Sequence, residues 1–260
     1  MKEGQRLWTR EELILALNLY SKIDFGKIHS RNPEIIKLSH SIKRTPGSVS
    51  YKLVNFASLD PAQKARGIRG ASNASKLDRE IWNEFYNNLD DYAFESEKLK
   101  ADIEHSTVEK ENDIDEEDLP KEGKERERIV KTRVNQSFFR KLILASYNNT
   151  CCITGIQQPN LLVAGHIRPW YLDEKNRMNP QNGIAINALH DKAFEDGLMT
   201  ITPDYKIKIS SVLLDQADNP PINEYFVKYH DKEIKLPWRF LPDQEFLRYH
   251  NRERFKQNRG

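Results

Sequence analysis

A strongly acidic segment with few apolar residues divides this chain of 260 residues and limits it to two folded blocks. Residues 90–128 hold 16 Asp and Glu against 7 Lys and Arg. Such a segment buries too little apolar surface to offset the entropy lost when it becomes ordered. We therefore expect a linker at 90–128, with local helix near Glu95–Ile103. It would join a first domain at 1–89 to a second at 129–260.

Both flanking blocks are basic. Residues 1–89 hold 15 Lys and Arg against 9 Asp and Glu, and residues 129–260 hold 19 against 14. Two basic ends suit a chain that contacts a polyanion. Ordinary solvated surfaces explain the same charges equally well.

The composition places the chain among proteins without membrane contact. No apolar run approaches the roughly 18 residues of a membrane span. No apolar stretch follows Met1, so we expect no secretory signal. The two cysteines, Cys151 and Cys152, are adjacent and cannot build a disulfide framework or a four-cysteine zinc site. We therefore expect a reducing, cytoplasmic setting.

Helical spacing dominates the first block. WTREELILALNLYSKI places apolar residues one turn apart behind a capping box of Thr9 and Glu12. NPEIIKLSHSI and TPGSVSYKLVNFASL predict two further helices, opened by Pro33 and Pro46. Three short helices, the last two joined by the turn KRTP, indicate a helix-turn-helix arrangement.

This block resembles three-helix Myb/SANT-like or homeodomain-like modules in its early Trp8 and in the RTPGSV entry to the third helix. The resemblance implies that the third helix reads DNA. The expected DNA contacts are polar side chains on this helix and at its entry: Arg44, Ser48, Lys52 and Asn55. Asn can bond adenine edges, and Lys and Arg can hold phosphates or guanine. The alternative is that these residues are the solvated face of a small helical domain.

A basic stretch rich in Gly and Ser follows the third helix. Its cations within 13 residues are Lys64, Arg66, Arg69 and Lys76. The stretch suits a clamp on a nucleic-acid backbone and suits an ordinary surface loop equally.

Short strands and helices alternate in the second block. RVNQSFFRKLILASYNN predicts a helix, LLVAGHI a buried strand that ends near His166, and NGIAI a second strand directly after Asn182. NALHDKAFED predicts a short helix that carries His190 and ends at Gly197. LMTITPDYKIKIS alternates like a hairpin. The order strand, loop, strand, helix puts one histidine on the first strand and one on the helix.

The pattern C-x-T-G, a strand ending in GHI-x-PW, then N-x-x-NG, then LH-x-x-AF-x-x-G resembles the HNH nuclease family over residues 133–201. The resemblance is closest to the branch found in bacterial restriction-type endonucleases. The first block is similar to the front domain of predicted bacterial HNH proteins of this kind. The resemblance implies an α+β protein with an N-terminal helical, helix-turn-helix-like domain and a C-terminal ββα-metal finger.

The resemblance also implies a role for each residue in hydrolysing a phosphodiester bond. His166 would be the general base, which suits a side chain with a pKa near 6.5. His190 would bind one divalent cation, expected to be Mg²⁺ with Mn²⁺ as an alternative. Asn182 would brace the loop so that His166 points correctly. Arg168 is expected to hold a phosphate.

One position departs from the family pattern. Many HNH enzymes carry a metal-binding acidic residue directly before the first histidine, where this chain has Gly165. Asp191 and Glu195 lie about 100° and 140° around the helix from His190. Glu195, at the helix end, is the expected second metal ligand; otherwise water completes the shell, as Mg²⁺ tolerates.

The leading hypothesis is therefore an HNH endodeoxyribonuclease of restriction type that acts on double-stranded DNA. One active site cuts one strand, so double-strand cleavage predicts a homodimer or two visits. The alternative is a non-cleaving DNA-binding protein or regulator with a degenerate finger, which Gly165 favours. A secreted HNH toxin is disfavoured because no delivery module is visible.

Overall fold

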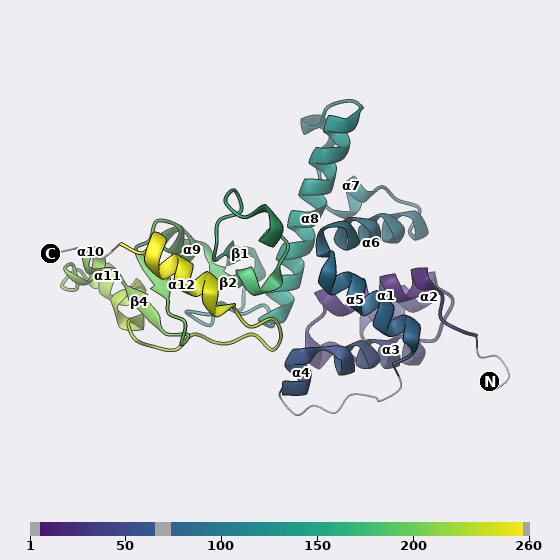
Figure 1. Cartoon of the computed structure of the whole chain (residues 1–260), viewed down its shortest axis with the longest axis horizontal. Coiled ribbons are helices and arrows are strands. Elements are labelled where there is room, and N and C mark those ends of the chain that lie inside the picture. The colour runs from purple at the N-terminus through teal and green to yellow at the C-terminus, as the bar shows by residue number, and fades with distance from the viewer. Residues whose placement is uncertain (1–5, 66–73, 257–260) are drawn as a thin grey trace. The chain divides into compact units, whose positions relative to one another are not determined.

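The computed structural model describes residues 6–65 and 74–256 and divides the chain into two compact units, Met1–Leu142 and Ile143–Gly260 (Figure 1). Helices predominate, and the second unit adds two small antiparallel sheets, so the α+β class is confirmed. Arg66 and Arg69 of the basic stretch lie outside the described residues. None of the described helices has the length and apolar composition that a bilayer crossing requires.

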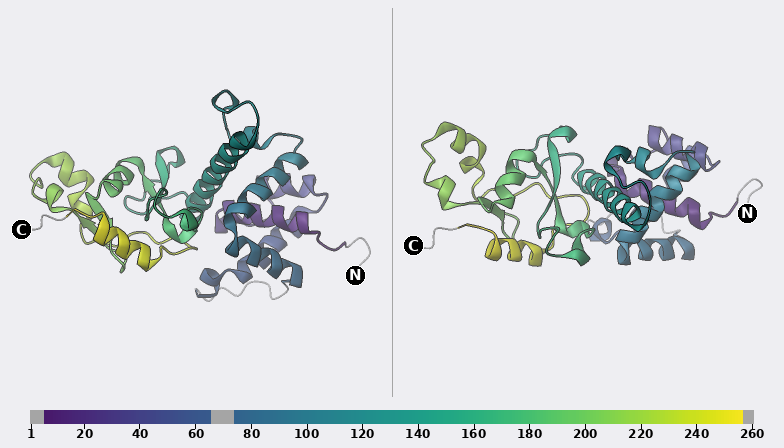
Figure 2. Two further views of the ribbon diagram at one scale, coloured as in Figure 1. Left: turned by 45° about the horizontal axis from the view of Figure 1, so that its top comes forward. Right: turned by 90° about the horizontal axis from the view of Figure 1, so that it is seen from above.

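The first unit is a bundle of helices around α1, which contacts α2, α3, α5 and α6. Figure 2 shows this bundle from two further sides. Its elements are α1 (Arg10–Lys22), η1 (Phe25–Lys27), α2 (Pro33–Ser41), α3 (Pro46–Leu59), α4 (Pro61–Ala65), α5 (Lys76–Asn87), α6 (Leu89–Ile103), α7 (Val108–Glu111), η2 (Glu116–Asp118) and most of α8 (Lys124–Ser146).

Local capping chemistry sets the helix starts of this unit. The capping box of Thr9 and Glu12 at α1 is present, as predicted. The predicted proline starts of α2 and α3 are also confirmed, each behind a side-chain cap. A second capping box at α5, formed by Ser75 and Asp78, was not foreseen. Each cap satisfies backbone N–H groups that have no partner inside the helix.

The structure departs from the expected linker at 90–128. Most of this segment folds into α6, α7 and η2, and it belongs to the first unit. Its few apolar side chains meet two valines of α8, so that Ile114, Leu119, Val130 and Val134 form a small core of their own. The apolar residues were too few for a local signal, but their partners arrive later in the chain.

The acidic charge of this segment is also neutralised by α8. Lys131 Nζ lies 2.6 Å from carboxylates of both Asp90 and Asp91. Arg126 lies 3.0 Å from Glu109 and 3.2 Å from Glu116. Part of the negative charge that favoured a solvated linker is therefore paired with cations of α8.

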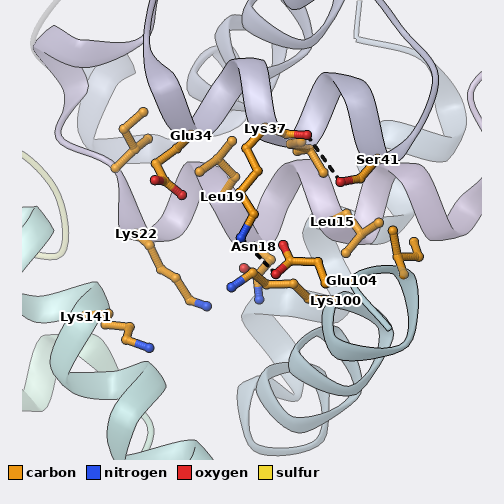
Figure 3. A pocket seen from close by; sticks show the side chains of 13 residues that line it. Leu15, Asn18, Leu19, Lys22, Glu34, Lys37, Ser41, Lys100, Glu104 and Lys141 are labelled. Atoms are coloured by element: carbon orange, nitrogen blue, oxygen red, sulfur yellow. Dashed lines mark hydrogen bonds and ion pairs between the residues drawn. The ribbon is translucent and has the colours of Figure 1, made fainter. Parts of the chain in front are cut away.

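Helix α6 is fastened to α1 through a buried ion pair. Glu97 is 1% exposed and receives hydrogen bonds from Lys22 Nζ and, at 2.6 Å, from Asn18 Nδ2. Figure 3 shows the neighbouring pocket, where Lys37 pairs with Glu104 at 2.8 Å. Because Glu97 of α6, Glu104 directly after α6 and Glu111 of α7 form ion pairs with three of its lysines, this pocket carries little net charge and receives no functional assignment.

The second unit contains the predicted strand–strand–helix motif. Strands β1 (Leu162–His166) and β2 (Gly183–Asn187) pair antiparallel, with His166 opposite Gly183. Helix α9 (Ala188–Glu195) follows β2 directly and contacts both strands. The chain leaves α9 through Gly197 at a φ of 72°, a left-handed conformation that glycine adopts without strain.

The remaining elements surround this motif. They are η3 (Pro159–Leu161), η4 (Glu174–Asn176), η5 (Pro180–Asn182), the predicted hairpin of β3 (Met199–Ile201) and β4 (Ile207–Ile209), α10 (Ser211–Leu214), α11 (Pro220–Tyr225), η6 (Val227–Tyr229) and α12 (Gln244–Glu253). Helix α12 packs beside β3 through Leu247 and His250, which are both buried.

Candidate active site

His166 ends β1 with its ring held in one orientation. Its Nε2 lies 2.9 Å from the backbone carbonyl oxygen of Arg177. A carbonyl oxygen only accepts a hydrogen bond, so Nε2 carries the proton and the neutral ring keeps its lone pair on Nδ1. Burial lowers the pKa of His166 below its usual value, so the ring is neutral at neutral pH.

The loop after β1 packs against this ring. Trp170 meets His166 edge to face, with ring centroids 5.4 Å apart. Arg177 donates from Nε to the Trp170 carbonyl oxygen at 2.9 Å, and its guanidinium lies 5.2 Å from the Trp170 ring centroid. Trp170 and Arg177 therefore fix both the face and the Nε2 edge of the imidazole.

Asn182 is buried beneath the same loop and joins its two ends. Its Oδ1 accepts from the Arg168 backbone N–H at 2.8 Å. Its Nδ2 donates to the carbonyl oxygens of Arg168 and Asn176, at 3.1 and 3.2 Å. The backbone carbonyl of Asn182 also accepts from the N–H of Ile167, next to His166. This geometry is what a loop brace requires.

A hollow of about 420 Å³ opens beside His166. Its charged lining comes from α9 and from the chain after α12: Asp191, Lys192, Glu195, Asp196 and Arg254. On the β1 side the lining includes Gly165, and a Cβ placed there would lie 2.5 Å from Asp191 Oδ1. The missing side chain at position 165 therefore leaves the space that the Asp191 carboxylate occupies.

Asp191 is half-buried without a cationic partner. Its carboxylate makes no hydrogen bond or ion pair with any residue that the structure describes. Burial, together with the negative charge of Glu195, raises the pKa of Asp191 to about 6. A cation bound beside such a carboxylate would stabilise its ionised form.

The expected role of His190 is not supported by its surroundings. Its Nε2 donates to the Tyr225 carbonyl oxygen at 2.6 Å, and its Nδ1 accepts from Asn187 Nδ2, also at 2.6 Å. The ring lies edge-on to Phe226 and Tyr229, is 2% exposed, and does not line the His166 hollow. Both ring nitrogens are occupied, and the two imidazoles do not share one hollow in this structure, so the metal-binding role of His190 stays a prediction without structural support.

The residues of the hollow fit a weakly ligated divalent ion. In residues 6–65 and 74–256, no three or more His, Cys, Asp and Glu side chains converge as a metal cage. Two carboxylates, Asp191 and the predicted Glu195, do share the hollow with His166. Magnesium is commonly held by one or two carboxylates while keeping several waters, so this set suits it.

Three of the four predicted DNA-reading residues of the first unit serve the fold instead. Lys52 is 7% exposed and donates to both carboxylate oxygens of Asp78 at 2.9 Å. Asn55 is 3% exposed. Arg44 lies 2.7 Å from Glu12 and its side chain is 8% exposed. The base-reading assignment of Arg44, Lys52 and Asn55 is therefore corrected: all three side chains are buried in the first unit rather than on a solvated face.

The two remaining predicted DNA contacts are Ser48 and Arg168. Ser48 is partly exposed in the first turn of α3, where its N–H donates to the Thr45 cap. Arg168 lies 3.1 Å from Asp173 and stacks over the ring of Tyr249, with its guanidinium carbon 4.8 Å from the ring centroid. It does not line the His166 hollow. Arg254, a residue that sequence reasoning did not single out, lines it instead.

Asn187 is a further residue that sequence reasoning missed. Its Oδ1 accepts from the His190 N–H, which caps α9, and its Nδ2 holds the His190 ring. Its backbone N–H and its Nδ2 both reach Cys151 Sγ, at 3.3 and 3.5 Å. An Asn directly before a helix is a capping signal that the sequence offered.

Comparison with known families agrees with this motif. Residues 151–202 match a family model described as HNH endonuclease. The match spans β1, the braced loop, β2, α9 and β3. No curated protein matches the chain.

Proposed function

From an HNH endonuclease domain at residues 151–202, we propose that this protein is a metal-dependent endodeoxyribonuclease of restriction type, with His166 as its general base. HNH nucleases generally use a divalent metal ion, and their domain implies a DNA substrate. The observation that carries the proposal is the fixed tautomer of His166, whose protonated Nε2 faces the Arg177 carbonyl oxygen.

The residues of the hollow divide the work of hydrolysis. His166 Nδ1 takes a proton from a water molecule, which then attacks phosphorus while the bond to the leaving oxygen breaks. Asp191 and Glu195 would hold a divalent ion, which supplies positive charge against the phosphate when bound. Arg254, which donates to the Glu195 carbonyl oxygen at 2.6 Å, is placed to attract a phosphate oxygen.

Cleavage of plasmid and phage DNA, unmodified and modified, tests the proposal. We expect nicks or breaks with Mg²⁺ or Mn²⁺, none with a chelator, and a loss of about 10²-fold or more for His166→Ala. His29→Ala, which removes an exposed histidine of the first unit, is the matched control and should cleave like the parent. Equal activity of the two variants would remove His166 from the mechanism.

A non-cleaving DNA-binding protein is the second candidate. The occupied nitrogens of His190 and the glycine at position 165 favour it, because the family pattern then lacks two metal ligands. Retained DNA binding without cleavage under any divalent ion would support this candidate over the nuclease.

A further inference from the structure

A basic groove lies in the first unit between the starts of α3 and α5. Its volume is about 960 Å³. Five cationic side chains line it, and no Asp or Glu does among the described lining residues. The cations are Arg6, Lys43, Arg44, Lys52 and Lys76.

Two of these cations are fixed over one aromatic ring. The Arg44 guanidinium lies 4.1 Å, and the Lys52 ammonium 5.1 Å, from the ring centroid of Trp8. Their counter-charges, Glu12 and Asp78, are 7% and 0% exposed and do not line the groove. Only two buried carboxylates offset the charge of five cations, so the groove keeps a net positive charge.

Of the other three cations, Arg6 lies 2.5 Å from Glu12, whereas Lys43 and Lys76 are open to solvent. Lys43 is exposed and makes no ion pair with a described residue. Lys76 has 92% of its side chain exposed and only a loose 3.7 Å contact with Glu80. In addition, the Nε of Arg44 is buried without a hydrogen-bond partner among the residues that the structure describes. The capping residues of α3 and α5 line the groove as well, adding the positive ends of two helices.

We propose that this groove binds the phosphate backbone of double-stranded DNA without reading its sequence. The inference rests on the proposed function, since it names the surface of the first unit that holds the nuclease substrate. Mobile point charges such as Lys43 and Lys76 suit phosphates, which position a protein on DNA, rather than base edges, which specify it. The amide that would have read bases, Asn55, is buried.

The test is fluorescence anisotropy of the full chain with a short labelled duplex, in a chelator so that no cleavage occurs. The double variant Lys43→Glu/Lys76→Glu should raise the Kd at least about tenfold. Each lost phosphate contact lowers the slope of log K against log salt by about 0.9, so the slope should flatten by roughly 2. The same loss should appear on duplexes of unrelated sequence.

The matched control is Lys98→Glu/Lys110→Glu, which makes the same charge change at two exposed lysines of the same unit outside the groove. It should leave the Kd within about twofold. Thermal unfolding of both double variants checks that the fold is intact. Equal binding by the two variants overturns the proposal, and so does tighter binding of single-stranded DNA or RNA than of duplex through the same lysines.

The outcome separates this inference from the nuclease assignment. His166→Ala should bind duplex DNA normally while failing to cleave it. If the groove variant binds normally and the parent cleaves, the groove proposal fails alone. If the groove variant loses binding and the parent never cleaves, the nuclease proposal fails alone.

Discussion

The carboxylate of Asp191 occupies the space that a side chain at Gly165 would need, because a Cβ at residue 165 would lie 2.5 Å from Asp191 Oδ1. Where many HNH enzymes carry an acid directly before the first histidine, this chain has a glycine with the carboxylate of a helix residue beside it. The site keeps its negative charge, but the charge comes from α9 rather than from β1.

Gly165→Ala should disturb this arrangement. The added methyl group would meet Asp191 Oδ1 at 2.5 Å and Ile186 Cγ2 at 3.3 Å, so the carboxylate must move. We expect a loss of about 1–3 kcal/mol of unfolding free energy, typical of overpacking, and weaker Mn²⁺ binding. Urea unfolding and Mn²⁺ titration by electron paramagnetic resonance measure the two effects. Unchanged Mn²⁺ binding would show that the carboxylate does not hold the ion.

Asp191→Asn and His190→Gln should separate metal binding from folding. Asp191→Asn should abolish measurable Mn²⁺ binding, whereas His190→Gln should retain it. Loss of the His190 hydrogen bonds with the Tyr225 carbonyl oxygen and the buried Asn187 amide should cost about 1–3 kcal/mol. Calorimetric titration with Mn²⁺ beside urea unfolding gives both results. The opposite pattern would restore His190 as the ligand.

Asp191→Asn should also change the pH dependence of stability. The folded pKa of about 6 lies above the ordinary value of 3.8, so the stability contributed by the protonated form is lost as pH rises through 6. At pH 7.5 without metal the variant should therefore be the more stable. Partial exposure limits the gain to roughly 1 kcal/mol. Thermal unfolding at pH 4 and 7.5 is the measurement, and an equal gain at both values would contradict this cause.

Cleavage should depend on a neutral His166. Because burial lowers the pKa of His166, the acidic limb of the pH–rate profile should fall below pH 6.5, and activity should persist at neutral pH. Single-turnover rates across pH 5–8 at saturating metal test this. A limb centred above pH 7 would assign the profile to another group.

Asn182→Asp should loosen the loop while keeping the volume of the side chain at position 182. A carboxylate cannot donate to the carbonyl oxygens of Arg168 and Asn176, so two buried hydrogen bonds are lost. We expect about 2–4 kcal/mol of destabilisation and slower cleavage. The control is Asn179→Asp in the same loop, where a partly exposed amide is lost, and it should cost less. Equal losses in urea unfolding would contradict the bracing role.

His250 should make the second unit sensitive to acid. Its ring stacks on Phe194 at 3.6 Å, and burial lowers its pKa from 6.5 to about 4. The folded state therefore favours the neutral ring, and stability falls as pH drops from 6.5 towards 4, by up to about 3 kcal/mol. His250→Phe should flatten this part of the stability curve. An unchanged curve would assign the acid sensitivity to other buried groups, such as His166.

Local chemistry allowed much of the fold to be predicted from the sequence. Thr9, Pro33 and Pro46 predict helix starts within one turn, the apolar run LLVAGHI predicts β1, and the Asn-Gly turn predicts the start of β2. The linker prediction failed because acids such as Asp90 are neutralised by Lys131, a partner 41 residues later. The composition of residues 90–128 alone does not reveal this pairing, because Lys131 lies outside the segment.

The candidate site could be predicted only in part, because some of its contacts also come from residues distant in the sequence. His166 and Asn182 follow from strand and loop positions close in sequence. His190 and Asp191 are neighbours on one helix, and helical geometry says only that they point in different directions. Asp191 rather than His190 lines the hollow, because the His190 ring is hydrogen-bonded to the carbonyl oxygen of Tyr225, 35 residues further along the chain.

Arg177 has a consequence for how this loop can vary. Its carbonyl oxygen holds the His166 ring, while its side chain returns to Trp170. The imidazole is thus anchored at the two ends of the excursion, at 170 and 177, and not at Glu174 and Lys175 between them, which are exposed. We expect that residues can be inserted between Glu174 and Lys175 without displacing the His166 ring, which makes this a permissive place for a tag or a fluorescent reporter.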